Sequence, residues 1–308
     1  MTKPDARKKN RRKASAGDVV FNVINYTVFI LITLACVFPF YYLFINTISS
    51  NELVRLGQIQ LIPKGIHFEN YVQVMKIPGI LDALFVSVAR TVLGTVWTVG
   101  GCAFLGYLCT KQEMWLRKLW YRLIIITMYF SAGLIPWYMN LRMLGFLDNF
   151  WVYVIPGLVS PYNVILVKTF IEGLPPSLEE SATLDGAGYT RVFCSIIMPL
   201  ITPILATLCI FSAVGQWNSF TDTMMLMPSG KYYTLQFLLY KYQNEASSLA
   251  ALVRNTQDSS SLANVATKQT ALSVRMTVAM VVTFPILFVY PFFQRYFVKG
   301  IMIGAVKG

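Results

Sequence analysis

The sequence predicts an all-α membrane protein, and the prediction rests on its composition and on the lengths of its apolar segments. Hydrophobic residues make up 56% of the 308 residues and charged residues only 13%, whereas a soluble domain carries about 25% charged residues. The mean hydropathy is +0.55. Six segments reach the length of about 20 mostly apolar residues that a membrane-spanning helix needs. These predicted spans are residues 19–45, 83–109, 121–141, 150–170, 195–217 and 274–296. Because backbone groups in hydrocarbon must be bonded within the segment, we expect each span to be a helix.

Basic residues near the ends of the spans predict the orientation. A basic tail, residues 1–18, precedes the first span, and a second basic group lies between the second and third spans, at Lys111, Arg117, Lys118 and Arg122. The positive-inside rule makes both groups cytoplasmic, and six spans return the C-terminal tail, residues 297–308, to the same side. The net charge of +12 is then explained by topology and by contact with lipid headgroups. We expect no nucleic-acid binding, since no recognition motif accompanies the charge.

Two long segments are predicted on the outer side, residues 46–82 and 219–273. Loops longer than about 15 residues tend to be functional or disordered. The second loop gathers tyrosines in its first half, at Tyr232, Tyr233, Tyr240 and Tyr242. Tyrosine suits contact with a sugar or with a partner protein. A small folded cap without a contact role is the alternative.

A short acidic segment, residues 172–194, lies between the fourth and fifth spans. Pro175 and Pro176 are expected to end the preceding helix, because neither offers a backbone N–H. Ser177 followed by Glu180 has the pattern of a capping box that starts a new helix, and Asp185-Gly186 supplies the turn that ends it. The segment between Ile171 and Thr190 has four acidic residues and no basic one. Anionic lipid would repel it, so we expect a protein partner.

The same segment carries a resemblance to a known family. Glu180-Ser181-Ala182, then Gly186, then Ile196 and Met198-Pro199 resemble the EAA signature of the membrane permease subunits of binding-protein-dependent ABC importers. Ser181 and Met198 depart from the commonest form, which has alanine and leucine there. A narrower resemblance, to carbohydrate permeases of the maltose-permease type and their oligosaccharide and polysaccharide branch, rests on three motifs. These are Ser160-Pro161-Tyr162-Asn163, Gly215-Gln216-Trp217-Asn218 and Val298-Lys299-Gly300.

The resemblance implies an ABC type I importer permease fold, with six transmembrane helices, residues 19–296, and a cytoplasmic coupling helix in segment 172–194. It implies a multi-pass protein of the bacterial cell membrane with both termini cytoplasmic. The implied partners are a second, non-identical permease, a cytoplasmic ABC ATPase dimer, an extracytoplasmic substrate-binding protein, a carbohydrate substrate and membrane lipid. The ATPase-coupling residues would be Leu178, Glu180, Ser181, Ala182, Leu184, Asp185, Gly186, Gly188 and Pro199. A homodimer of this chain is the alternative to two different permeases.

No enzymatic activity, cofactor or metal site is expected in this chain. The sequence lacks the G-x-x-x-x-G-K-[ST] phosphate loop, so ATP hydrolysis is expected in the separate ATPase subunit. A single histidine excludes a histidine-based zinc cluster. An ion-gradient-driven secondary transporter is the alternative from another class, but such proteins often carry acidic residues inside their spans, and these spans have almost none. Import of a peptide or another polar solute also stays open.

Polar residues within the spans are candidates for the substrate pathway, because they are costly in hydrocarbon. Asn163 lies in the fourth span beside Tyr162, and Gln216, Trp217 and Asn218 close the outer end of the fifth. Amide groups beside an aromatic ring fit the hydroxyl rim and apolar face of a sugar. Hydrogen bonding between helices is the alternative. Two charged residues, Arg90 and Lys168, are expected to extend to the membrane interfaces instead.

Overall fold

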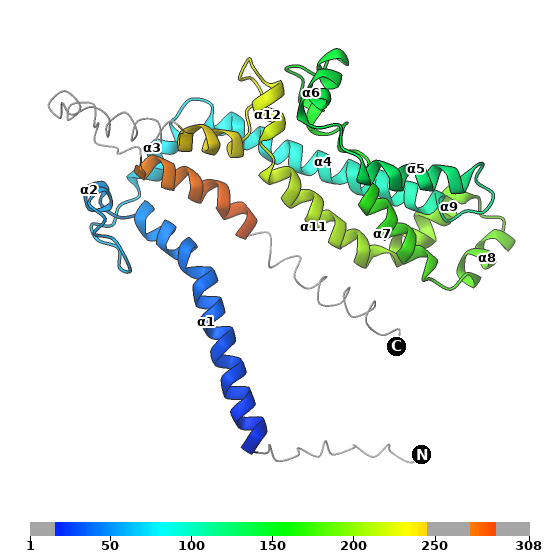
Figure 1. Ribbon diagram of the computed structural model, residues 1–308, viewed down its shortest axis with the longest axis horizontal. Helices are drawn as coiled ribbons and strands as arrows, with labels where there is room; N and C mark the ends of the chain where they lie inside the picture. The colour runs from blue at the N-terminus through cyan, green and yellow to red at the C-terminus, as the bar shows by residue number, and fades with distance from the viewer. Residues whose placement is uncertain (1–15, 245–271, 288–308) are drawn as a thin grey trace. The chain divides into compact units, whose positions relative to one another are not determined.

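The computed structural model describes residues 16–244 and 272–287, and the chain divides into two compact units, Met1–Phe68 and Glu69–Gly308. All regular secondary structure in the described residues is helical (Figure 1). Two of these helices, Gly17–Thr47 and Ile80–Leu108, are each long and apolar enough to cross a membrane. They contain most of the first and second predicted spans. Residues 1–15 of the predicted N-terminal tail, residues 288–296 of the sixth predicted span and the predicted C-terminal tail, 297–308, lie outside the described residues.

The first unit is built on α1 (Ala16–Thr47). Its apolar side chains are exposed along most of its length, as expected of a helix whose surroundings are lipid or another chain. The segment after it, with α2 (Asn51–Arg55), folds back on the end of α1. Ser50 donates its N–H to the Lys64 carbonyl (3.0 Å), and His67 donates its N–H to the Ile48 carbonyl (2.8 Å).

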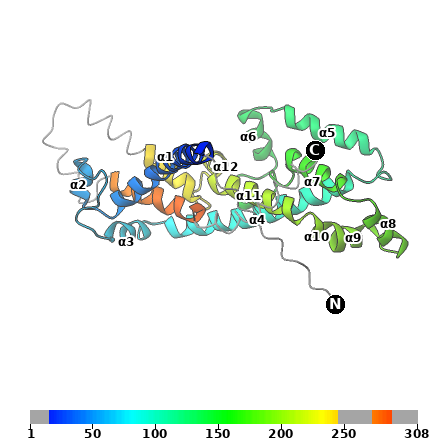
Figure 2. The same ribbon diagram turned by 90° about the horizontal axis from the view of Figure 1, so that it is seen from below.

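The second unit starts with α3 (Glu69–Met75) and α4 (Ile80–Leu108). Helix α4 packs along α7 (Pro161–Glu172) and α11 (Thr202–Asn218), and both views show the three helices side by side (Figures 1 and 2). Small residues make this contact close. A Cβ added at Gly106 of α4 would lie 2.7 Å from the Cγ1 atom of Val167 on α7.

The third and fourth predicted spans are interrupted in the structure. Residues 121–141 are divided between α5 (Arg117–Tyr129) and α6 (Leu134–Met143). The break contains Gly133, whose φ of +88° is compatible with glycine but not with a regular helix. Residues 150–170 begin as the 3₁₀ helix η1 (Phe150–Tyr153), and α7 begins only at Pro161. Pro156 and Gly157 lie between them, and both residue types interrupt helices.

The fifth predicted span begins earlier than expected and is bent. It runs through α9 (Tyr189–Val192), the π-helical segment η2 (Phe193–Ile197) and α10 (Met198–Leu200) before α11, and the bend amounts to 80°. Pro203 has no N–H to donate to the Pro199 carbonyl, so that backbone bond is missing. The hydroxyl of Thr202 donates to this carbonyl instead (2.8 Å).

The long predicted loop 219–273 contains α12 (Thr221–Leu226) and a helix over residues 235–244; residues 245–271 lie outside the described part. The sixth predicted span, 274–296, corresponds to a helix described over Leu272–Leu287. The bent pair Tyr189–Leu200 and Thr202–Asn218, if it is taken as one span, is also long and apolar enough to cross a membrane. It would be the third such helix in the described part of the chain.

Candidate coupling segment and polar pocket

Helix α8 (Ser177–Leu184) lies in the acidic segment, where a short helix was predicted. The capping-box prediction was wrong, because Ser177 is already inside the helix and Pro176 occupies the cap position without a side-chain cap bond. Pro176 has helical dihedral angles, φ −59° and ψ −30°, which the proline ring favours. Its carbonyl therefore accepts the first helical bonds, from the N–H groups of Glu179 (3.0 Å) and Glu180 (3.1 Å).

The end of α8 has the pattern of a Schellman motif, as the predicted Asp185-Gly186 turn suggests. Ala187 donates its N–H to the Ala182 carbonyl (2.9 Å), and Gly186 donates its N–H to the Thr183 carbonyl (3.0 Å). This motif requires a left-handed residue, and Gly186 has φ +79°. Gly188 has no such requirement, because its φ is −73° and a Cβ there would meet nothing within 4 Å.

One face of α8 is anchored to the rest of the unit. Ala182 is only 8% exposed and belongs to a hydrophobic cluster with residues of α4, α7, η2 and α11. Tyr107 at the end of α4 packs against Phe193 of η2, with ring centroids 5.1 Å apart. The Tyr107 hydroxyl also donates to the Tyr189 carbonyl (3.3 Å). Helix α8 is therefore tied by its inner face to the helices that form the core of the second unit.

Much of the remaining surface of α8 is open. Leu184 is 89% exposed, the highest value among the exposed large apolar side chains that the structure describes, and Leu178 is 40% exposed. Ser181, Glu180 and Asp185 are exposed on the same segment. The two carboxylates have no side-chain partner among the residues that the structure describes.

The other two carboxylates of the acidic segment are paired with lysines of the same chain. Glu179 forms an ion pair with Lys111, which lies in the connection between α4 and α5. Glu172 pairs with Lys168 (2.6 Å) one turn earlier in α7. The Lys111 ammonium also lies 4.3 Å from the centroid of the Tyr107 ring. A cleft of about 520 Å³ is lined by residues of this connection and of α8.

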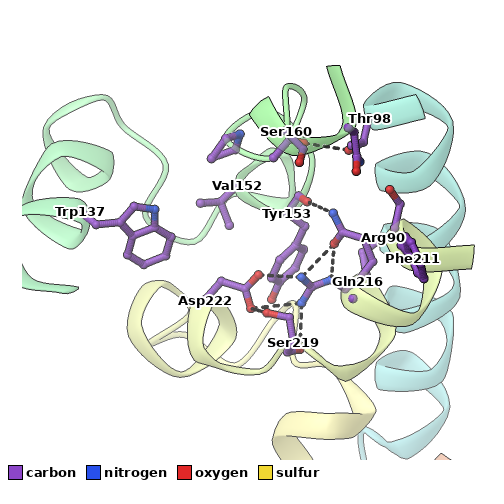
Figure 3. A pocket seen from close by; sticks show the side chains of 15 residues that line it. Arg90, Thr98, Trp137, Val152, Tyr153, Ser160, Phe211, Gln216, Ser219 and Asp222 are labelled. Carbon is purple, nitrogen blue, oxygen red and sulfur yellow. Dashed lines mark hydrogen bonds and ion pairs between the residues drawn. The ribbon is translucent and has the colours of Figure 1, made fainter. Parts of the chain in front are cut away.

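A polar pocket of about 510 Å³ is lined by residues of α4, α6, η1, α7, α11 and α12 (Figure 3). Its buried wall holds Arg90, which is 2% exposed. The guanidinium binds the Asp222 carboxylate with two bonds, of 2.6 and 3.1 Å. It also donates to the Gln216 side-chain oxygen (3.0 and 3.3 Å) and to the Ser219 carbonyl (3.2 Å).

The prediction that Arg90 extends to the membrane interface was wrong. Its side chain turns inward because Asp222 offers a carboxylate and Gln216 offers an amide oxygen, and the Tyr153 ring lies 4.3 Å from the guanidinium carbon. Asp222 lies 132 residues further along the chain, and no local pattern links the two. Lys168 reaches one turn further along α7 to the exposed Glu172, and its extension to the cytoplasmic interface stays a prediction.

The five predicted pathway residues are separated by the structure. Asn163 and Gln216 line the polar pocket. Trp217 points elsewhere, since it is 8% exposed, belongs to another hydrophobic cluster and donates its ring N–H to the Val282 carbonyl (3.0 Å). Tyr162 and Asn218 are exposed and are not among the residues that line the pocket.

Comparisons with known proteins agree with this architecture. A family model described as "Binding-protein-dependent transport system inner membrane component" matches residues 102–303. Protein LplC of Bacillus subtilis (strain 168) is 32% identical over 293 residues, and the match covers 94% of this chain and 95% of that protein. The polygalacturonan/rhamnogalacturonan transport system permease protein YtcP of the same organism is 30% identical over 289 residues, with 94% and 99% covered.

A solved structure is also similar. It is the crystal structure of a bacterial ABC transporter involved in the import of the acidic polysaccharide alginate, matched with a TM-score of 0.80 and 27% identity. The match covers 93% of this chain and 99% of that chain. With sequence relatives and a solved structure that align along nearly its whole length, this chain belongs to the family of inner membrane components of binding-protein-dependent transport systems.

Proposed function

We propose that this chain is the membrane-spanning permease subunit of an ATP-driven importer and forms half of the pathway for an oligosaccharide or polysaccharide fragment. The observation that carries the proposal is α8, a short helix that is fixed in the core through Ala182 and leaves Leu178 and Leu184 exposed. The names of relatives point to carbohydrates, among them polygalacturonan/rhamnogalacturonan and arabinooligosaccharides.

Three protein partners follow from this function. A cytoplasmic ABC ATPase dimer hydrolyses ATP, so this chain is not itself an enzyme. A second, non-identical permease completes the pathway, and an extracytoplasmic binding protein delivers the sugar. The chain lies in the bacterial cell membrane with both termini in the cytoplasm, an orientation that the basic tail and the basic connection around Lys111 support.

The coupling step is a movement of α8 with the ATPase. Leu178 and Leu184 are the apolar contacts, because both are open to solvent, and burial of such a side chain contributes about 1.5–3 kcal/mol. Glu180 and Asp185 supply negative charge for a basic group on the ATPase. Ser181 lies between them on the exposed side.

The remaining residues of the coupling segment hold its shape. Ala182 positions α8 on the core, and Gly186 forms the turn that ends it. Gly188 follows as an extended residue, and Pro199 lies just before the bend that leads into α11. Force applied to α8 is in this way passed to α4, α7 and α11. We assign the pathway role to Asn163 and Gln216, and a packing role to Trp217.

A single exposed leucine tests the coupling role. We expect Leu184→Ser to lower both sugar uptake and binding-protein-stimulated ATP hydrolysis of the reconstituted complex about tenfold, since a contact worth about 1.4 kcal/mol or more is lost. The fold should be unaffected, because the side chain is 89% exposed. Leu144→Ser, at a leucine that is 63% exposed outside the coupling segment, is the control. Wild-type uptake by the Leu184→Ser complex would exclude the proposed contact.

A further inference from the structure

The polar pocket contains side chains with unused hydrogen-bonding capacity. Asn163 is only 7% exposed, yet its amide makes no hydrogen bond to any residue that the structure describes, although it lines the pocket. The hydroxyls of Ser160 and Ser212 line the same space and have no partner within the described part of the chain. Asn163 is not among the described residues that have a sealed, unpartnered polar atom, so its amide is open to the pocket. With these hydroxyls it offers donors and acceptors suited to a ligand rich in hydroxyls.

The charges on the pocket wall are already neutralised. A guanidinium has five N–H donors, and Arg90 uses all five, two each on Nη1 and Nη2 and one on Nε. The Asp222 carboxylate is also paired: its Oδ2 accepts from Arg90, and its Oδ1 accepts from Arg90, the Ser219 hydroxyl (3.2 Å) and the Thr223 N–H (2.9 Å). Arg90 and Asp222 are the charged residues of the pocket lining. Among the described residues that line the pocket, no cation is available for an anionic ligand.

Aromatic side chains provide apolar surface. The Trp137 indole extends from α6 toward the pocket, and Phe211 lines it from α11 (Figure 3). Aromatic faces match the C–H faces of sugar rings, while amides and hydroxyls match the sugar hydroxyls. The volume of about 510 Å³ falls within the range of about 300–1,000 Å³ typical of small-molecule sites.

We propose that this pocket is a binding subsite for an uncharged sugar unit and discriminates against uronic acid units. Trp137 stacks on the ring, Asn163 binds its hydroxyls, and Arg90 serves as a positioning residue that fixes Gln216. A uronate carboxylate would have to lose its hydration without gaining a counter-ion, which is unfavourable. The proposal rests on the carbohydrate-import function. The predicted preference for uncharged sugar units also differs from the preference for acidic units that the names of two similar proteins would suggest.

Matched saccharides test the proposal in the complete complex of both permeases and the ATPase dimer, in nanodiscs and without the binding protein. The probes are α-1,4-linked tetragalacturonate, its fully methyl-esterified form and maltotetraose, with affinities from saturation-transfer NMR titration. We expect the two neutral probes to bind and the tetragalacturonate to bind at least about tenfold more weakly. The difference corresponds to a desolvation cost of about 1.4 kcal/mol that no counter-ion offsets.

Variants of this chain assign the binding to the pocket. Trp137→Ala and Asn163→Ala should each weaken neutral binding about tenfold, as expected for one lost stacking or hydrogen-bonding contact. Trp151→Ala and Asn140→Ala are the controls, because both residues are exposed and absent from the pocket lining. Neutral binding should be unchanged in these two variants.

Three results would overturn the subsite: equal or tighter binding of tetragalacturonate, no binding of either neutral probe, or loss of binding in the controls as large as in the pocket variants. The same preparation separates this failure from failure of the proposed function. If the wild-type complex shows binding-protein-stimulated ATP hydrolysis and the Leu184→Ser complex does not, the importer function is supported. Only the proposed subsite is then contradicted.

Discussion

The Arg90–Asp222 ion pair should be a major determinant of stability in the second unit. Its side chains are 2% and 14% exposed, compared with 14% and 46% for Lys168 and Glu172. Removing one partner of a buried pair typically costs about 3–5 kcal/mol, because the remaining charge is left uncompensated. The corresponding cost for an exposed pair is about 0–1 kcal/mol.

We therefore predict that Asp222→Asn markedly lowers the thermal unfolding midpoint of the purified complex, whereas Glu172→Gln leaves it nearly unchanged. Both substitutions replace a carboxylate by an amide of similar size, so the comparison isolates the buried charge. The double variant Arg90→Met/Asp222→Leu should recover much of the loss, since it removes both charges. Equal midpoints for Asp222→Asn and Glu172→Gln would contradict this account.

Gly186 and Gly188 should respond differently to the same substitution. An alanine at Gly186 has to adopt φ near +79°, which costs an L-residue about 1–2 kcal/mol. At Gly188, φ is −73° and alanine fits without strain. Gly186→Ala should therefore reduce coupled ATP hydrolysis by misdirecting the end of α8, while Gly188→Ala should have wild-type activity. A defect of equal size in both variants would show that glycine is needed because a side chain does not fit at the ATPase interface, and not because of the backbone conformation.

At the scale of the elements, local signals predicted α8 and its terminal turn, because helix ends depend on residues adjacent in sequence. The mistaken capping box has a local cause as well. Because Pro176 adopts helical dihedral angles, it takes the cap position, and Ser177 is already the first residue of the helix. The breaks at 130–133 and 154–160 were missed because the spans were assigned by hydropathy, although Gly133, Pro156 and Gly157 are local signals of an interruption. Hydropathy measures the length of an apolar segment but not the continuity of its backbone bonds.

The close contact between α4 and α7 leads to another prediction. A Cβ at Gly106 would lie 2.7 Å from Val167 Cγ1 and 3.2 Å from the Val164 carbonyl oxygen, whereas a Cβ at Gly100 of the same helix would meet nothing within 4 Å. Gly106→Ala should destabilise the complex by about 1–3 kcal/mol through overpacking. Gly100→Ala should be neutral or slightly stabilising, because alanine is the better helix former by about 1 kcal/mol. The measurement is the thermal unfolding midpoint of the complex with each variant. Equal midpoints for Gly106→Ala and Gly100→Ala would contradict the prediction.

At the scale of the whole molecule, α4 links the two functional regions. The stretch from Arg90 in the pocket wall to Tyr107 beside α8 covers about 26 Å at 1.5 Å per residue. Both ends are held by contacts between residues distant in sequence, Arg90 with Asp222 and Tyr107 with Tyr189 and Phe193. Sequence patterns did not reveal either contact, since neither partner lies within one helical turn of the other. A movement of α8 can therefore be transmitted to the pocket through the packed side chains along α4.

The ion pair between Lys111 and Glu179 provides a test of that route, because it joins the α4–α5 connection to α8. We predict that Lys111→Glu, which places two like charges together, lowers sugar uptake per ATP hydrolysed. The double variant Lys111→Glu/Glu179→Lys should restore it, since the pair is re-formed with its charges exchanged. A coupling free energy of about 0.5–3 kcal/mol is typical of residues in direct contact. If instead Glu179 acts by binding a basic group of the ATPase, the double variant will remain defective, and the connection will have no part in transmission.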